Sequence, residues 1–167
     1  MKSSIGIDVA APPDLLFRLA RDVERWPRLL PHYVAADREG PPDPDGRLLV
    51  RFIARRPILP ILGLGLPVAW RSLTWSDAEH RRLRFAHRGG ATNGMDVTWR
   101  IEPVGTDGRR TRVEIEHEFR PRVPGWAWLM DRLFTRPIAG RTLATFQALA
   151  EALVDESGGD PAANPLS

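Results

Sequence analysis

The sequence has no cysteine among its 167 residues, so disulfide bonds and thiolate metal sites are excluded. It also lacks any run of about 20 apolar residues, the length that a membrane-spanning helix needs. Residues 1–5 do not form the apolar stretch of a signal peptide. We therefore expect a cytoplasmic protein.

Lysine is almost as rare, since Lys2 is the only one. The isoelectric point of about 10.4 reflects the many arginines, which do not lose their proton, because the net charge is only +3. Basic and acidic residues also interleave, as in residues 21–25. A nucleic-acid-binding surface needs clustered positive charge. The sequence therefore predicts no nucleic-acid partner.

Compact catalytic motifs are missing as well. Gly63 and Gly65 are not followed by the third glycine of a dinucleotide-binding loop, and there is no phosphate-binding loop. The zinc-protease motif His-Glu-x-x-His and the hydrolase motif Gly-x-Ser-x-Gly are absent. The four histidines show no metal-ligand spacing. We expect neither a metal nor a cofactor.

What the sequence does contain, between residues 33 and 119, is an alternation of apolar and polar residues with the period of half-buried β-strands. Turn signals such as Gly89-Gly90 and Asn93-Gly94 separate the alternating stretches. Such short connections join neighbouring antiparallel strands. The predicted strands are 4–9, 33–39, 47–55, 68–75, 82–87, 95–102 and 110–119.

Helical patterns flank these strands. Pro12-Pro13-Asp14 opens a first helix that Trp26-Pro27 breaks, and a short second helix ends before Pro31. A long C-terminal helix is predicted over residues 126–154, interrupted or kinked at Pro137 because proline lacks a backbone donor.

The order of elements is thus strand, two helices, six strands and one long helix. It predicts an α+β domain over residues 1–156, in which a curved antiparallel sheet of about seven strands grips the C-terminal helix. The residues from 157 to 167 are predicted to form a disordered tail. Because one helix cannot fill the concave side of such a sheet, we expect an internal pocket.

Local residues resemble those of a known superfamily. The resemblance rests on residues 11–13, Asp22-Val23-Glu24-Arg25-Trp26-Pro27, Pro31-His32, Asn93-Gly94, residues 99–103, residues 112–115, Phe119 and Pro124-Gly125-Trp126. Together with the order of elements, these resemble the START/polyketide cyclase (helix-grip) superfamily, and within it the bacterial polyketide cyclase/dehydrase and coenzyme Q-binding-protein-like branch. The resemblance implies a cavity for a lipid, quinone, polyketide or aromatic metabolite.

Strand parity indicates which side chains face this cavity. In the last strand Ile115, His117 and Phe119 share the apolar face. His117 is a candidate acid or base, or else a hydrogen-bonded structural histidine. Tyr33, the only tyrosine, is a second candidate, as a donor to a ligand carbonyl or as a residue that caps the core.

The parity of the strand at residues 68–75 is ambiguous. Either Trp70 and Ser72 face inward, or Arg71 does, in which case Arg71 could stabilise an enolate. We therefore take Arg71, His117 and Tyr33 as candidate catalytic residues. The expected ligand-contacting residues are Tyr33, Phe52, Trp70, Ser72, Phe85, His87, Met95, Trp99, Ile115, His117, Met130 and Leu133.

The segment from Pro57 to Pro67 is apolar throughout and rich in proline and glycine, so neither a helix nor a regular strand is predicted there. It is interpreted either as a lid, as a membrane or protein contact through Ile58–Leu66, or as a loop folded back onto the core.

Three functions follow from these observations. The first is binding of a hydrophobic small molecule for sequestration or transport. The alternative is a cofactor-free polyketide cyclase or dehydratase that promotes aldol-type cyclisation and aromatisation. The third is a protein-interaction module that uses the apolar segment. The sequence leaves the ligand and the oligomeric state open.

Overall fold

The computed structural model describes residues 1–59, 64–90, 92–119 and 125–158; of residues 56–59, 64–66, 127, 130, 133, 134, 157 and 158 it describes the backbone alone. Strand β1 (Lys2–Val9) is followed by α1 (Pro13–Arg21), the 3₁₀ turn η1 (Val23–Arg25) and α2 (Trp26–Leu29). The next six elements are the strands β2 (Tyr33–Arg38), β3 (Leu48–Leu59), β4 (Leu64–Asp77), β5 (Arg82–Gly90), β6 (Met95–Val104) and β7 (Arg110–Phe119). The chain ends with α3 (Trp126–Met130), the π-helical turn η3 (Asp131–Thr135) and α4 (Arg136–Gly158).

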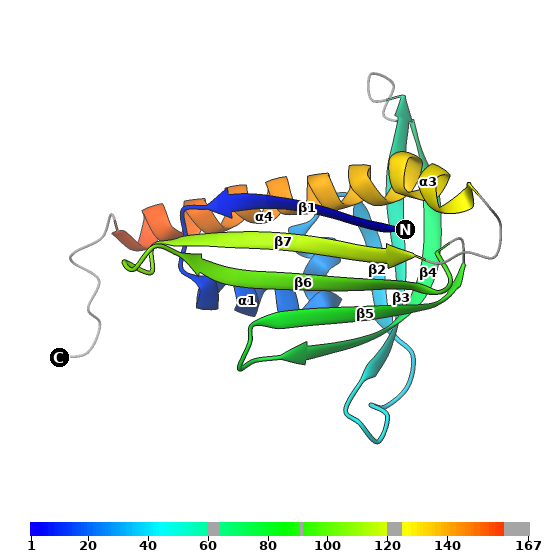
Figure 1. Cartoon of the computed structure of the whole chain (residues 1–167), viewed down its shortest axis with the longest axis horizontal. Helices are drawn as coiled ribbons and strands as arrows, with labels where there is room; N and C mark the ends of the chain where they lie inside the picture. The colour runs from blue at the N-terminus through cyan, green and yellow to red at the C-terminus, as the bar shows by residue number, and fades with distance from the viewer. Residues whose placement is uncertain (60–63, 91, 120–124, 159–167) are drawn as a thin grey trace.

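The strands form one antiparallel sheet in the order β1-β7-β6-β5-β4-β3-β2. The six later strands are consecutive neighbours, and β1 closes the far edge by pairing with β7. Figure 1 shows β2, β3 and β4 crossing the direction of β5, β6 and β7, so the sheet is curved, and α4 runs along it beside β1. The predicted α+β architecture of a curved sheet around a C-terminal helix is confirmed.

The predicted parity of β7 is also confirmed. Val113, Ile115, His117 and Phe119 are buried, while Glu116 on the opposite face forms an ion pair with Arg100 at 2.7 Å. The alternation places a continuous row of side chains towards the interior.

The ambiguous parity of β4 is resolved by its pairing with β3. Phe52 lies opposite Trp70, and Val50 lies opposite Ser72, so these pairs share one face of the sheet. Trp70, Ser72 and Val50 are all buried. Arg71 therefore points to the other, solvated face.

Two predictions about the connections between strands were wrong. The Pro57–Pro67 segment is not irregular throughout, because the β3–β4 ladder continues through Arg55 and Pro67 to Pro57 and Gly65, with a bulge before the pair of Leu59 and Leu64. This hairpin projects beyond the rest of the sheet (Figure 1). Its tip, residues 60–63, and the side chains of Ile58–Leu66 lie outside the described residues, so a contact through them stays a prediction.

The Gly89-Gly90 pair is not a turn either. Strand β5 runs to Gly90, and the pairing shifts between Trp70 and Ser72, which marks a β-bulge. Gly90 has a φ of 75°, and a Cβ there would lie 2.5 Å from the carbonyl oxygen of Ala69. Only glycine tolerates both conditions.

The C-terminal helix is interrupted close to the predicted position. The π-helical turn Asp131–Thr135 ends just before Pro137, the second residue of α4. Because proline lacks the N–H of a regular helical turn, a change in the helical hydrogen-bond pattern is expected at this point. Helix α4 extends to Gly158, four residues beyond the predicted end at Val154 and into the segment predicted as disordered. Residues 159–167 lie outside the described part, so the domain boundary remains a prediction.

The first helix ends earlier than the sequence predicts, at Arg21, and Trp26 begins α2 rather than breaking a helix. Trp26 is buried at the centre of the core, and its indole Nε1–H donates to the carbonyl oxygen of Ala20 at 3.0 Å. Pro27 occupies the first turn of α2, where proline is favoured.

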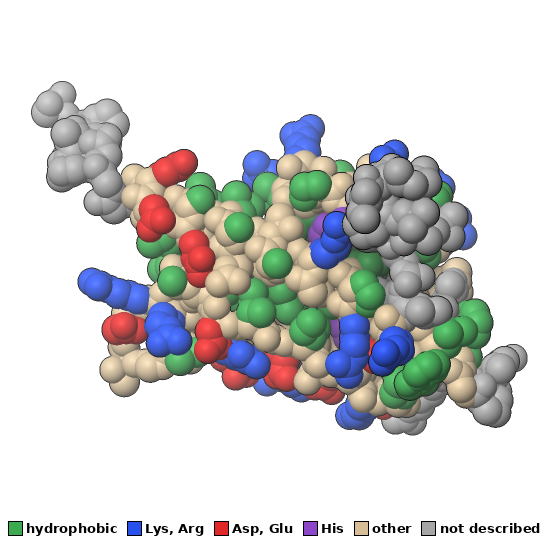
Figure 2. All heavy atoms as spheres, turned by 90° about the horizontal axis from the view of Figure 1, so that it is seen from above, with side chains coloured by type: hydrophobic (Ala, Val, Ile, Leu, Met, Phe, Trp, Pro, Cys, Tyr) green, Lys and Arg blue, Asp and Glu red, His purple; other side chains and the backbone are tan. Residues whose placement is uncertain are grey.

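On the surface, basic and acidic side chains interleave (Figure 2). Across β1, β6 and β7 they form ion pairs, such as Lys2 with Glu118 and Arg112 with Asp8. Among the described residues, no helix is both long and apolar enough to cross a membrane.

Candidate functional site

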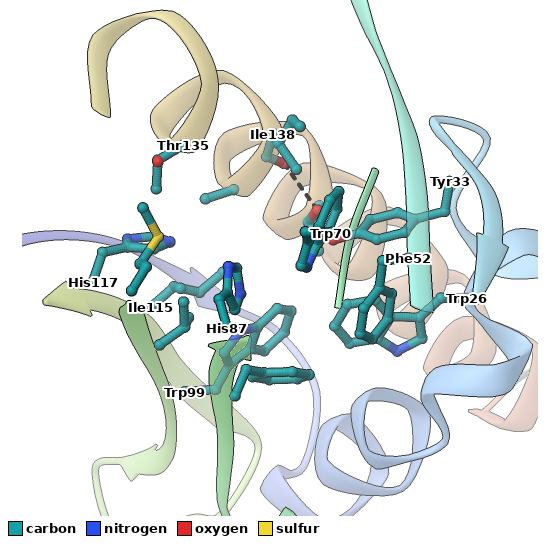
Figure 3. Close-up of a pocket in the computed structure, with 15 residues that line it drawn as sticks. Trp26, Tyr33, Phe52, Trp70, His87, Trp99, Ile115, His117, Thr135 and Ile138 are labelled. Carbon is teal, nitrogen blue, oxygen red and sulfur yellow. Dashed lines mark hydrogen bonds between the residues drawn. The ribbon is translucent and has the colours of Figure 1, made fainter. Parts of the chain in front are cut away.

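A cavity of about 60 Å³ lies between the concave face of the sheet and the helices η3 and α4 (Figure 3). Sites for drug-sized ligands measure roughly 300–1,000 Å³, so a larger ligand requires this cavity to widen. It is lined by Trp26, Tyr33, Phe52, Trp70, Phe85, His87, Met95, Val97, Trp99, Ile115, His117, Thr135, Ile138, Ala139 and Thr142.

One end of the cavity, which we call the aromatic end, is formed around Trp26, Tyr33 and Phe52 (Figure 3). The ring of Trp26 lies 5.1 Å from that of Tyr33 and 5.5 Å from that of Trp99, in edge and tilted contacts. Phe52 stacks on Trp70 at 5.4 Å. These offset and edge contacts are the favoured geometries of aromatic pairs, so they hold the wall rigidly.

The polar groups at the aromatic end already have partners. The Thr142 hydroxyl donates to the carbonyl oxygen of Ile138 at 2.9 Å, and therefore accepts from Nε2–H of His32, also at 2.9 Å. Burial raises the pKa of Tyr33, against the opposing effect of its hydrogen bond with Thr142. Burial, followed by the charge of Arg141, lowers the pKa of His32 to about 4. These groups are uncharged at neutral pH.

The opposite end, which we call the polar end, is formed by His87, His117 and Thr135 (Figure 3). Nδ1 of His87 lies 2.7 Å from the hydroxyl of Thr92, and its ring stacks on Trp70 at 5.9 Å. Burial, followed by the nearby His117, lowers the pKa of His87 to about 3. The ring of His87 is therefore neutral at pH 7 and fixed in orientation.

His117 is held differently. No hydrogen bond joins its ring to another residue in the part of the chain that the structure describes. Burial is the main cause that lowers its pKa to about 4, while the carboxylate of Asp131 raises the pKa and Arg136 lowers it. At pH 7 His117 is thus a neutral imidazole with unused hydrogen-bonding capacity beside a carboxylate.

That carboxylate is itself fixed. Asp131 is buried in the π-helical turn, accepts a hydrogen bond from the Ser3 hydroxyl at 2.6 Å, and is bonded by Arg136 Nε at 2.7 Å. The ion pair neutralises the buried charge, so Asp131 acts on His117 through space and not by direct contact.

Nine of the predicted ligand-contacting residues line the cavity: Tyr33, Phe52, Trp70, Phe85, His87, Met95, Trp99, Ile115 and His117. Ser72 is buried but does not line it, because its hydroxyl bonds the carbonyl of Leu73 at 3.2 Å. The side chains of Met130 and Leu133 lie outside the described residues.

The prediction for Arg71 requires correction. Its guanidinium bonds Glu39 at 2.8 Å on the convex face, and 58% of its side chain is exposed. It borders a shallow hollow there with Arg51 and Gly90. Since the parity of β4 turns it away from the cavity, Arg71 cannot stabilise charge on a ligand held inside.

Six lining residues are absent from the sequence-based set: Trp26, Val97, Thr135, Ile138, Ala139 and Thr142. Val97 shares the parity of Met95 and Trp99, so its place was readable from the sequence. The residues from η3 and α4 were not, because the rotation of a helix about its own axis depends on packing and, here, on the π-helical turn.

The chemistry available in this cavity is that of neutral hydrogen-bonding groups in an aromatic enclosure. None of the described lining residues is Asp, Glu, Lys or Arg. No group of His, Asp or Glu able to hold a metal ion is found among the described residues.

The family model of polyketide cyclase/dehydrase and lipid transport proteins matches residues 2–153. Because the match covers nearly the whole chain, the chain belongs to this family.

Among curated proteins, the chain is 27% identical over 141 residues to the granaticin polyketide synthase bifunctional cyclase/dehydratase of Streptomyces virginiae. The aligned region is 82% of this chain but 43% of that protein, so the chain spans less than half of this relative's length.

Two solved structures are similar to the chain. The di-domain ARO/CYC BexL from the BE-7585A biosynthetic pathway is 25% identical, with a TM-score of 0.71, over 93% of this chain and 48% of BexL. The Zhui aromatase/cyclase from Streptomyces sp. R1128 is 19% identical, with a TM-score of 0.75, over 96% of this chain and 99% of that one. The second likeness establishes the fold alone.

Proposed function

We propose that the chain binds a polyketide-like ligand in its cavity and promotes cyclisation and dehydration of that ligand. The observation that carries this proposal is a pair of uncharged histidines, His87 and His117, inside an aromatic enclosure. The cyclase/dehydratase and aromatase/cyclase names of the similar proteins support the same reaction class.

His117 is the residue we assign to proton transfer. In an aldol-type step its free nitrogen takes a proton from a CH₂ group between two ketones, and the resulting carbanion bonds to another carbonyl carbon. The alkoxide formed then takes a proton from the imidazolium. Loss of this hydroxyl with a neighbouring hydrogen, as water, yields a double bond. The Asp131 carboxylate stabilises the transient imidazolium, because it raises the pKa of His117.

With Arg71 outside, negative charge on the ligand oxygen must be stabilised by neutral donors. The candidates, both of which line the cavity, are the imidazole of His87 and the hydroxyl of Tyr33, which would exchange its hydrogen bond with Thr142 for one with the ligand. Prepositioned donors in a water-poor site stabilise a developing oxyanion without reorganisation. Tyr33 thus remains a candidate catalytic residue.

The test uses a synthetic poly-β-ketone, which cyclises spontaneously in several ways. The wild-type protein is expected to enrich one ring pattern, measured by liquid chromatography and mass spectrometry. His117→Gln is expected to slow the protein-dependent reaction about 100-fold or more. His80→Gln, at an exposed histidine paired with Asp77, is the matched control. An unchanged rate in His117→Gln would exclude the proposed role.

Binding and delivery of a hydrophobic molecule is the second candidate. It is favoured by the largely apolar lining, and by the satisfied hydrogen bonds at the aromatic end. Native mass spectrometry of the purified protein is expected to detect a co-purified hydrophobic ligand under this hypothesis. Ligand binding without any change in poly-β-ketone products would favour it over catalysis.

A further inference from the structure

Three threonines on the C-terminal helical segment differ in how their hydroxyls are bonded. In α4, Thr142 donates to the carbonyl of Ile138 and Thr145 to that of Arg141, each at 2.9 Å and each four residues back. This is the usual way in which a helical threonine satisfies its hydroxyl. Thr135 does not follow the rule: its hydroxyl is buried and has no partner among the described residues.

The π-helical turn accounts for this difference. Thr135 is the last residue of the turn, in which backbone bonds span five residues rather than four. The carbonyl oxygen four positions back is that of Asp131, and in this turn the hydroxyl of Thr135 does not bond it. The turn thus leaves a hydroxyl unsatisfied, although a buried hydroxyl without a partner costs about 1–3 kcal/mol.

The position of Thr135 at the cavity wall makes its hydroxyl available to a ligand. Thr135 is 5% exposed and lines the cavity directly above His117, at the polar end (Figure 3). Threonine in a helix populates two side-chain rotamers, so its hydroxyl can turn towards a ligand. The ring of His117 likewise bonds no other described residue. Two hydrogen-bonding groups without a partner among the described residues therefore line the same end of the cavity.

We propose that Thr135 and His117 form a hydrogen-bonding subsite for one uncharged hydroxyl or carbonyl oxygen of an aromatic ligand. The subsite rests on the proposed function, in that it requires the cavity to hold a ligand. It deepens that function by naming the ligand's chemistry: a flat apolar body with a neutral oxygen at the polar end.

The residues that line the cavity disfavour charged ligands. The described lining carries no acidic side chain, lysine or arginine, and its histidines are neutral at pH 7. Arg136, the nearest cation to His117, is engaged by Asp131. A carboxylate at this end would lose its hydration without gaining a counter-charge, which is strongly unfavourable.

The test compares phenol, toluene and benzoate, which share one ring and differ in the group presented to the subsite. Binding at pH 7 is followed through the indole N–H signals of ¹⁵N-labelled protein by NMR. Trp26, Trp70 and Trp99 line the cavity and report binding there. Trp128, which is 62% exposed, reports non-specific contact.

The decisive variant is Thr135→Val, which keeps the shape and removes the hydroxyl. It is expected to weaken phenol binding about fivefold, the value of one hydrogen bond, and to leave toluene binding within about twofold. Thr135→Ser is expected to restore phenol binding. Benzoate is expected not to shift the cavity signals at concentrations at which phenol saturates them.

Thr145→Val is the matched control, since Thr145 is a threonine of α4 that does not line the cavity and whose hydroxyl bonds the carbonyl of Arg141; the ratio of phenol to toluene affinity should be unchanged in it. The subsite is overturned if Thr135→Val weakens both probes equally, or if benzoate binds as well as phenol. Failure of all three probes to shift Trp26, Trp70 or Trp99 would instead overturn the ligand-binding function itself, together with the subsite.

Discussion

The two ends of the cavity are built from similar residue types but are left in opposite states. At the aromatic end, the hydroxyl of Thr142 and the ring of His32 bond each other and the helix backbone. At the polar end, neither the hydroxyl of Thr135 nor the ring of His117 has a hydrogen-bond partner among the described residues. One cavity wall can therefore contain an end whose hydrogen bonds stabilise the fold and an end whose polar groups are available to a ligand.

Among changes to the cavity wall, substitution of Trp26 at the aromatic end should lower the stability of the protein most. Trp26 contacts five other rings, and its indole N–H bonds Ala20. Trp26→Ala should lower the free energy of unfolding by about 3–5 kcal/mol, because it leaves a large cavity in the core. Urea denaturation followed by circular dichroism measures this loss. Trp128→Ala, at an exposed position, should change it by less than about 0.5 kcal/mol.

Lowering the pH should reduce the stability of the folded protein, because both ends of the cavity contain buried neutral histidines. His32 and His117 have folded-state pKa values of about 4, and His87 of about 3, all below the usual 6.5. The unfolded chain therefore binds protons that the folded chain does not, so stability is constant above about pH 7 and falls as the pH drops towards 4.

Each of these histidines should remove about 2 kcal/mol between pH 6.5 and pH 5. The measurement is the urea midpoint as a function of pH. His87→Gln should flatten the fall, whereas His80→Gln, at an exposed position, should leave it unchanged. A stability that rises on acidification in this range would contradict the assignment of neutral buried rings.

The two cavity threonines should respond in opposite directions. Thr142→Val leaves Nε2–H of His32 buried without an acceptor, and should cost about 1–3 kcal/mol. Thr135→Val removes a hydroxyl that has no partner among the described residues, and should be neutral or stabilising by up to about 1 kcal/mol. Thermal and urea unfolding of both variants provide the measurement. Equal destabilisation would mean that Thr135 is bonded as Thr142 is.

The sheet was predictable because apolar and polar residues alternate along its strands, and this alternation matches the buried and exposed faces. The parity of His117 in β7 follows from its apolar neighbours Ile115 and Phe119, and short turns such as Asn93-Gly94 dictate the antiparallel order. The bulge at Gly89-Gly90 escaped prediction, because a glycine pair signals a turn and a bulge equally well.

The helical side of the cavity was less predictable. A π-helical turn inserts one residue and rotates everything after it, so a regular period cannot be carried from Trp126 across residues 131–135 into α4. Within α4 the period does hold, because Ala139, Leu143, Phe146 and Ala150 recur at helical spacing and are buried. The importance of Thr135 comes from a hydrogen bond that is not made, which leaves no signal in the sequence. The charge network of Ser3, Asp131 and Arg136 joins residues up to 128 positions apart, and only the fold brings them together.

Substitution of Arg71 should have the smallest effect on stability. It also distinguishes most clearly between the cavity and the convex face of the sheet as the site of the reaction. Its ion pair with Glu39 is largely exposed, and such pairs contribute about 0–1 kcal/mol. Arg71→Gln should therefore change the free energy of unfolding by less than about 1 kcal/mol, and should leave phenol binding and poly-β-ketone products unchanged. His117→Gln, on the opposite face of the sheet, is the variant that should change them. If Arg71→Gln abolished cyclisation while the protein remained folded, catalysis would have to occur on the convex face, beside Arg51 and Gly90, and the cavity would lose its assigned role.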